Sequence, residues 1–403
     1  AAHQQFLQSF DERHGGFGQA PKFPQAPLLG LLRTMSVMGK PFSEPARSML
    51  HRTLLSMSLS GLRDHLDGGF FRYTVDGSWT IPHFEKMLYD NAMLLPLYAQ
   101  AARDNEHPVL RQSAEGICSW LQEQMRHENG GFYASMDADA GGIEGAFHVW
   151  DREELEQLLT AEEYAETART FGIDGPPNFE NRHWHLVWND DEPLGSLTLS
   201  AMQKMREARA LSTAPGTDTK QLTSWNALCI DGLAVAGLAL HREDWVDLAE
   251  QAMSFTRETA WKDGTLYAVH AEGRTGFPAY LDDHAFLLKA CLSLLRARWD
   301  QRHLSFAIEL ADALIDRFTD PANGGFIYSS ATQVMPVARM RPLQDDATPS
   351  GNGIAAIALE ELGHLMAEQR YLKAAAGILR SSISEQQQHP VAHATLLVAL
   401  QAQ

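Results

Sequence analysis

A Gly-Gly-Phe turn recurs along this chain and restricts its fold more than any other feature. It occurs at Gly15-Gly16-Phe17, Gly68-Gly69-Phe70, Gly130-Gly131-Phe132 and Gly324-Gly325-Phe326, with a variant at Asp263-Gly264-Thr265-Leu266-Tyr267. The turns are separated by roughly 60 residues or by about twice that distance, a period typical of repeat architectures. The spacing predicts six units, and the unit without a turn falls near 184–188, where alternating residues predict a short strand.

Between the turns, apolar residues follow helical spacing and form helix pairs. The predicted pairs are 28–39 and 50–61, 84–102 and 107–127, 151–170 and 197–211, 223–240 and 243–261, 280–298 and 302–318, and 349–367 and 370–383. A last segment, 391–400, is suited to close a ring. Links within pairs are short, and links between pairs are long and contain the turns. We therefore expect one all-α domain over 1–403, an (α/α)6 barrel with short β-hairpins in its long loops and an irregular insert at about 171–222.

Composition excludes several classes of function. The net charge of -18 argues against nucleic acid and anionic membranes as partners. The most apolar stretch, 229–240, is shorter than the roughly 18 residues of a membrane span, so no membrane segment is predicted. Cys118, Cys229 and Cys291 lie far apart without metal-binding spacing. They predict free structural thiols in a reducing compartment, the cytoplasm, and no metal or cofactor is expected.

Side chains suited to sugar recognition are concentrated where the first helix of each pair begins. A ring of such pairs places these positions, and all the long loops, at one mouth. Aromatic rings stack on pyranose faces, and polar groups bind hydroxyls. We expect a small-molecule sugar as the partner. The candidate binding residues are Lys22, Arg72, Trp79, Asp90, Asn91, Asp137, Trp150, Trp225, Asn226, Ser350 and Asn352, and the candidate catalytic residues are His83, Glu85, Asp282, Asp283 and His284.

Several of these residues also have a structural interpretation. His83 is either a catalytic group or a helix cap, and Asp90, two turns into the predicted helix, either orients His83 or reaches an outer loop. One of Asp282 and Asp283 suits an N-cap, which leaves the other free to face the pocket. Asn226 and Asn352 suit either hydroxyl recognition or capping.

Other candidates have weaker signals. The segment 137–144 resembles a calcium loop, but its glutamate comes too early and glycine occupies a ligand position, so an acidic loop at the site is favoured. His148 and His270 are weaker candidates for the site.

At these residues the chain resembles the YyaL / spermatogenesis-associated protein 20 family. The resemblance rests on the runs 19–24, 72–73 through 82–91, 224–226 and 347–352, above all on His-Phe-Glu-Lys-Met-Leu-Tyr-Asp-Asn at 83–91. It implies a six-hairpin glycosidase-like barrel related to N-acylglucosamine 2-epimerases. Family members carry a thioredoxin-like domain, absent here, which would be a partner in the full-length protein. The chain starts Ala1-Ala2 without methionine and thus looks like the C-terminal part of a longer protein. His148 and His284 replace tyrosines of the family pattern.

Three functions remain open at this point. A metal-independent sugar isomerase or 2-epimerase would use His83 and His284 as its acid and base, with Asn226 and Lys22 on the substrate oxygens. A glycoside hydrolase would use two carboxylates, Glu85 or Asp137 against Asp282 or Asp283. A non-catalytic module would bind sugar or protein beside the thioredoxin-like domain.

Overall fold

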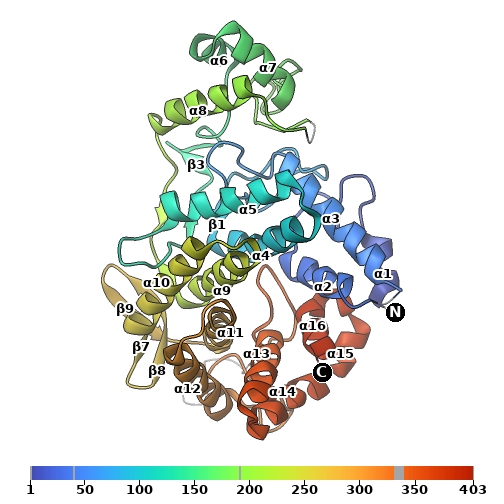
Figure 1. The fold of residues 1–403 in the computed structure, drawn as a ribbon, viewed down its shortest axis with the longest axis vertical. Coiled ribbons are helices and arrows are strands. Elements are labelled where there is room, and N and C mark those ends of the chain that lie inside the picture. Colours follow the sequence, from blue (N-terminus) through green and yellow to red (C-terminus); the bar gives the residue numbers. More distant parts are fainter. Residues whose placement is uncertain (1, 40, 190–191, 331–339, 403) are drawn as a thin grey trace.

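The architecture is a ring of six inner helices. A computed structural model describes residues 2–39, 41–189, 192–330 and 340–402. In ring order the inner helices are α2 (Ala26–Ser36), α4 (Leu88–Asn105), α9 (Thr223–Leu240), α11 (Leu281–Ala297), α13 (Gly351–Met366) and α16 (Ala394–Ala402). Each contacts the next, and α16 returns to α2 (Figure 1). The ring is closed as predicted, with the C-terminal segment as its sixth member.

Outer helices pack against five of the inner ones. They are α3 (Ser43–Leu59), α5 (Pro108–Trp120), α10 (Glu243–Ala260), α12 (Gln301–Phe318) and α14 (Gln369–Ser381). A π-helical turn, η1 (Leu121–Met125), continues α5, and α1 (Ala2–Ser9), α15 (Ile383–Gln388) and the 3-10 turn η2 (Pro390–His393) lie beside the sixth position. One large apolar core joins the two layers. The predicted all-α (α/α)6 barrel is therefore confirmed.

The strands are short and antiparallel, and they lie in the long connections, as predicted. One sheet has the order β1 (Lys86–Met87), β2 (Ser135–Met136) and β5 (Thr217–Asp218), and β3 (Asp139–Ala140) pairs with β4 (Ile143–Glu144). In the largest sheet, β8 (Thr265–Ala271) pairs with β6 (Gln221–Leu222), β7 (Trp261–Lys262) and β9 (Arg274–Pro278). The strand predicted at 184–188 is reduced to one bridge, between Trp150 and Trp184.

Helix α9 corrects the expectation that no segment is long and apolar enough to cross a membrane. Its 18 residues reach that length and hydropathy, and 72% of them are buried inside the protein. The helix lies between α4 and α11 in the ring and is covered outside by α10. Its apolar character on all sides therefore matches a helix surrounded by other helices.

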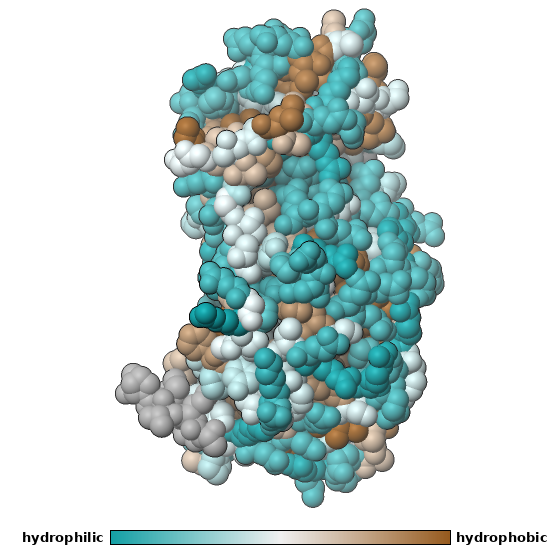
Figure 2. All heavy atoms as spheres, turned by 90° about the vertical axis from the view of Figure 1, so that its left-hand side faces the viewer, coloured by the Kyte–Doolittle hydropathy of each residue, from teal (hydrophilic) through white to brown (hydrophobic). Residues whose placement is uncertain are grey.

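The third predicted hairpin lies outside the ring. Its helices α6 (Arg152–Leu158), α7 (Ala161–Phe171) and α8 (Ser196–Ala210) pack on one another and form a second apolar cluster, at the top of Figure 1. The predicted insert of about 171–222 thus begins earlier, because α6 and α7 belong to it; its residues 190 and 191 lie outside the described part. Apolar residues gather on this end in Figure 2, and Leu197 and Leu199 of α8 are exposed.

A buried ionic cluster fastens α8 to the barrel. The Nη1 of Arg209 donates to Asp64 Oδ1 and to Asp67 Oδ2, each at 2.9 Å, and Lys86 Nζ donates to Asp64 Oδ2 at 2.8 Å. Although burial raises the pKa of Asp64, the charges of Arg209 and Lys86 hold it well below its usual range. His148, a weak site candidate, is buried beside the same carboxylate with its Nδ1 3.5 Å from Oδ2.

Candidate functional site

Two adjoining cavities open where the inner helices begin, and together they are called the mouth cleft here. The first, about 660 Å³, is lined by 23–28 before and in α2, by Arg72, by Tyr89 and Asp90 of α4, and by residues from 345–347 and 388–392. The second, about 860 Å³, is lined by Asp282, 340–346, 348–351, Glu385 and His393. Asp345 and Asp346 line both. Segments far apart in the sequence therefore share one opening.

A polar cluster forms the α4 wall of the first cavity. Arg72 Nη1 donates to Glu85 Oε2 at 3.2 Å, and Arg72, Tyr89 and Asp90 line the cavity. Helix α4 begins only at Leu88, so Asp90 is in its first turn rather than two turns in, as the sequence suggested. The ring of Tyr89 meets the edge of Trp225 at a centroid distance of 4.8 Å. Three predicted residues, Arg72, Glu85 and Asp90, are therefore neighbours here.

Asp90 has the properties of a proton donor. Its side chain is buried, and its Oδ2 has no hydrogen-bond partner among the described residues. Burial raises the pKa of Asp90 well above its usual range, Glu85 adds to the rise, and the Arg72 guanidinium opposes it. A carboxylic acid with a raised pKa keeps its proton to higher pH than an ordinary aspartate, and it is then able to donate a proton or a hydrogen bond to a ligand oxygen.

The two aspartates at the start of α11, Asp282 and Asp283, have different roles. Asp283 accepts from the backbone N–H of Tyr280 at 2.8 Å and of Ser224 at 3.0 Å, so it caps α11 and fixes the start of α9. Asp282 lines the second cavity, and its Oδ1 has no partner among the described residues. Burial and then the charge of Asp283 raise the pKa of Asp282 to about 7. One aspartate is thus structural and the other faces the cleft.

The structure does not bring His83 and His284 together. His83 precedes α4 instead of starting it; its Nδ1 pairs with Glu144 Oε1 at 2.7 Å, and its ring stacks on Tyr73, which stacks on Phe23 of the first cavity. Asp90 is not its hydrogen-bond partner.

His284 is buried, donates through Nδ1 to the Tyr280 carbonyl at 2.9 Å and packs on Phe318, and it does not line the cleft. Burial lowers the pKa of His284 to about 4.

Three predicted asparagines hold the glycine turns. Asn91, Asn226 and Asn352 each accept from the N–H and donate to the C=O of the phenylalanine in one turn, at 2.7–2.9 Å. The partners are Phe70, Phe132 and Phe326 respectively. In the turn the chain runs against an outer helix: a Cβ on Gly131 would lie 2.4 Å from Phe255. The amides are therefore used inside the protein, which supports the structural interpretation rather than hydroxyl recognition.

The other predicted binding residues have separate places. Buried Lys22 donates to Asp11 Oδ2 at 2.7 Å and lies over Trp79, whose Nε1 donates to the His14 carbonyl, so both anchor the N-terminal loop.

Trp150 is buried in the insert cluster. Asp137 is exposed, with its N–H bonded to the Gly216 carbonyl. Ser350 caps α13 by accepting from Gly353 N–H at 3.0 Å and lines the second cavity. His270, on β8, contacts Thr275.

Sequence reasoning missed three residues of the cleft. Tyr89 lies inside the 83–91 run but was not singled out. Asp345 accepts from Ser350 N–H and from Thr395 N–H, each at 2.8 Å, and so joins the starts of α13 and α16. His393 is buried, and its Nε2 has no partner among the described residues. Because His393 directly precedes the last inner helix, its position in the sequence could have identified it as a residue of the mouth.

The cleft offers acids, a guanidinium and aromatic rings. Among the described residues, no three His, Cys, Asp or Glu side chains of the cleft bring ligand atoms within 4.8 Å of one another. The three cysteines are free and buried elsewhere, as predicted. The arrangement can therefore bind a hydroxylated ligand and transfer protons at carboxyl groups.

Three solved structures with the same fold are sugar-processing proteins by name. A cellobiose 2-epimerase from Bacillus thermoamylovorans matches with a TM-score of 0.61 at 10% identity, over 94% of this chain and 83% of that one. A D-mannose isomerase matches with a TM-score of 0.58 at 11% identity, over 95% and 84%. An unsaturated glucuronyl hydrolase specific for heparin gives 0.55 at 11% identity, over 94% and 81%. These likenesses establish the six-hairpin barrel class.

Curated sequence relatives carry the name that the motifs indicate. An uncharacterized Caenorhabditis elegans protein is 32% identical over 439 residues, covering 97% of this chain and 60% of that protein. Human spermatogenesis-associated protein 20 is 28% identical over 450 residues, covering 99% and 57%. The chain is thus homologous to these proteins over nearly its whole length, and it spans about three fifths of theirs. No family model matches the chain.

Proposed function

We propose that the mouth cleft binds a small sugar and that the chain is a metal-independent sugar isomerase or 2-epimerase. The observation that carries the proposal is a pair of buried carboxyl groups, Asp90 and Asp282. Each lies in the first turn of an inner helix, lines the cleft, carries a buried oxygen that lacks a partner among the described residues, and has a raised pKa. The names of the barrel neighbours support the choice of sugar as ligand.

The chemistry fits the two aspartates better than the two histidines. Exchange between aldose and ketose, or between 2-epimers, moves a proton on and off the carbon beside a carbonyl. The base should have a pKa near the working pH, which Asp282 supplies at about 7. Asp90, protonated, would donate to the substrate oxygen, and the Arg72 guanidinium would stabilise the negative charge that develops there. The ring of Phe23, which lines the first cavity and stacks on Tyr73, offers a surface for a pyranose.

Hydrolysis is the second candidate, and one observation favours it. Glu85, held by Arg72, lies close enough to Asp90 to raise the pKa of Asp90, so a second carboxyl group lies beside the buried one. A glycosidase needs this combination. Water would then attack the anomeric carbon as Asp90 protonates the leaving oxygen.

One experiment separates these reactions. The protein is incubated in D2O with glucose, mannose, fructose, N-acetylglucosamine, N-acetylmannosamine and cellobiose, and followed by NMR. Deuterium at C1 of a new ketose supports isomerisation, deuterium at C2 of a new aldose supports isomerisation or epimerisation, and released monosaccharide supports hydrolysis. Asp90→Asn is expected to abolish either reaction while saturation-transfer signals from bound sugar persist. If the unaltered protein binds a sugar without converting it, the chain is a non-catalytic binding module. If it shows no binding and no turnover, the proposal is overturned.

A further inference from the structure

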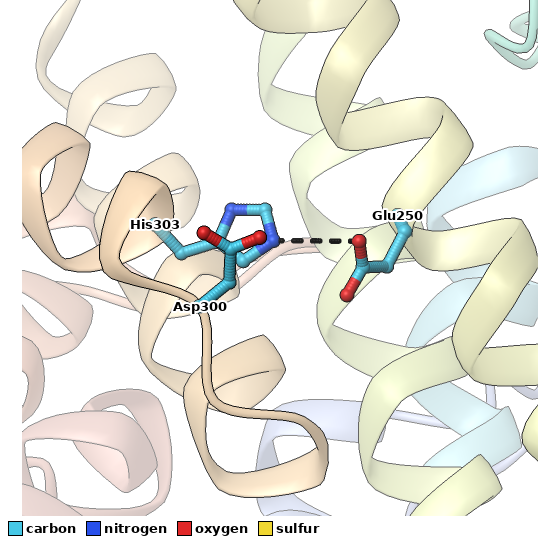
Figure 3. A group of neighbouring side chains, drawn as sticks. All are labelled: Glu250, Asp300 and His303. Carbon is cyan, nitrogen blue, oxygen red and sulfur yellow. Dashed lines mark ion pairs between the residues drawn. The ribbon is translucent and has the colours of Figure 1, made fainter.

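A group of metal-ligand side chains lies apart from the mouth cleft, between α10 and the start of α12. Glu250 projects from α10, while Asp300 directly precedes α12 and His303 lies in its first turn (Figure 3). One ligand atom from each lies within 4.8 Å of the others. We propose that these three residues bind a divalent transition-metal ion, with Zn²⁺ as the representative case.

His303 is the observation that points to a ligand. Its side chain is 7% exposed, and its Nε2 is directed at Glu250 Oε2 at 3.7 Å (Figure 3). That separation is too long for a hydrogen bond, and Nε2 has no such partner among the described residues. Two ligands on a tetrahedral zinc ion with bonds of about 2.1 Å are separated by about 3.4 Å. The two atoms are therefore placed as ligands of one ion would be.

The other carboxylate oxygen of Glu250, Oε1, is also available to a metal ion. This oxygen is buried and has no hydrogen-bond partner among the described residues, and the Arg298 Nη1 lies 3.9 Å away. Arg298 is itself engaged by Glu243 and Asp247, each at 2.7 Å. A buried carboxylate oxygen without a partner is costly, and a bound cation would remove that cost.

The side chains around these three residues carry a net negative charge that a divalent cation would balance. Four carboxylates, those of Glu243, Asp247, Glu250 and Asp300, face two guanidinium groups, those of Arg298 and Arg302, which leaves a net charge of -2 if His303 is neutral. Arg302 competes for both oxygens of Asp300: its Nη2 and Nε donate to Oδ2 at 2.6 and 3.0 Å, and its backbone N–H donates to Oδ1 at 2.7 Å. The Arg302 side chain is 70% exposed, so solvent screens its pair with Asp300, and an ion bound at Asp300 would displace the guanidinium into water.

The ligand set indicates the class of metal. One imidazole and two carboxylates suit Zn²⁺ or Co²⁺ with water completing the coordination, whereas Ca²⁺ and Mg²⁺ prefer oxygen ligands alone. The ion would connect an outer helix of one hairpin to the start of the next outer helix. Because the three residues meet only in the folded chain, binding should stabilise it.

Titration of the chelator-treated protein with ZnCl2, followed by calorimetry, tests the site. We expect one tight equivalent, a rise in Tm, and a visible absorption band when Co²⁺ replaces Zn²⁺. His303→Gln and Glu250→Gln should each weaken this equivalent by at least roughly 100-fold. His364→Gln is the matched control, since His364 lies near Glu360 on α13 at 3.9 Å but is 69% exposed.

A further variant separates metal loss from misfolding. Arg302→Ala removes the competing cation and should keep or tighten Zn²⁺ binding without changing the fold seen by circular dichroism. The proposal is overturned if His303→Gln and Glu250→Gln, folded as judged by circular dichroism, bind Zn²⁺ as tightly as the unaltered protein. It is also overturned if the unaltered protein takes up no stoichiometric ion, or only as weakly as surface histidines do.

Discussion

Asn226 illustrates how single residues support the cleft without entering it. Its amide pairs with both backbone groups of Phe132 and also donates to the Leu222 carbonyl at 3.0 Å. The sequence placed Asn226, correctly, at the start of an inner helix. It could not show which way the amide points, because capping and ligand recognition use the same donors and acceptors.

Asn226→Ala should lower the free energy of unfolding by about 2–4 kcal/mol, because it leaves buried backbone groups of the turn unpaired. Urea unfolding at equilibrium measures the change. Asn105→Ala is the control: this exposed amide makes one bond, to the Ala101 carbonyl at 2.9 Å, and should cost under about 1 kcal/mol. Equal losses in the two variants would contradict the structural role.

Asp282 gives a pH dependence with a definite sign. Its pKa is raised in the folded protein, to about 7 from 3.8. Ionisation of Asp282 therefore opposes folding. As the pH rises from about 4 to about 7, the free energy of unfolding should fall by up to roughly 4 kcal/mol because of this group.

Asp282→Asn cannot ionise and should escape that loss. Urea unfolding of both proteins at pH 5, 6, 7 and 8 should show the variant gaining stability relative to the unaltered chain as the pH rises. A difference that stays constant across this range would show that Asp282 titrates as an ordinary exposed aspartate.

At the scale of elements, the helices follow from the sequence and the attachment of the insert does not. Thr223–Leu240 and Glu243–Ala260 match their predicted ranges closely because apolar periodicity and short links define them. The helices of 152–210 were also expected, but as a ring hairpin. Periodicity shows that a helix has an apolar face and leaves open which partner covers it; here the three helices cover one another.

Arg209→Met should lower stability by about 3–5 kcal/mol, since it leaves the buried Asp64 and Asp67 carboxylates short of a cation. Hydrogen exchange should accelerate first in α8. Arg206→Met is the comparison: Arg206 also pairs with Asp67, at 3.1 Å, but its side chain is 36% exposed, so a loss under about 1 kcal/mol is expected. Unchanged exchange in α8 of Arg209→Met would argue against the anchoring role.

For the whole molecule, the ring and its common mouth were predictable, and the identity of the acids was not. The alternation of short and long links fixed which helix ends share a face. Burial decided the rest: Asp282 and Asp283 are adjacent and chemically identical, yet one caps two helices and the other lines a cavity. His393 was missed because the sequence does not show that this residue lines a cavity together with Asp282 and residues from 340–351.

Closure of the ring by α16 should be essential for cooperative folding. Leu396 is fully buried there, and Leu396→Ala should cost about 2–5 kcal/mol. Leu400, on the same helix, is 47% exposed, and Leu400→Ala should stay within about 0.5 kcal/mol of the unaltered protein. Thermal unfolding followed by calorimetry compares them; similar Tm values for the two variants would mean that α16 is peripheral.

The central claim is that the mouth of this ring is a sugar site, and blocking the mouth tests it most directly. Ala347 is exposed and lines the first cavity, so Ala347→Trp should fill the cleft without disturbing the core. Ala322→Trp places the same ring on an exposed loop outside both cavities. Saturation-transfer NMR with the sugars named above should show binding to the unaltered protein and to Ala322→Trp, and none to Ala347→Trp. Equal signals from all three proteins, or none from any, would contradict the account.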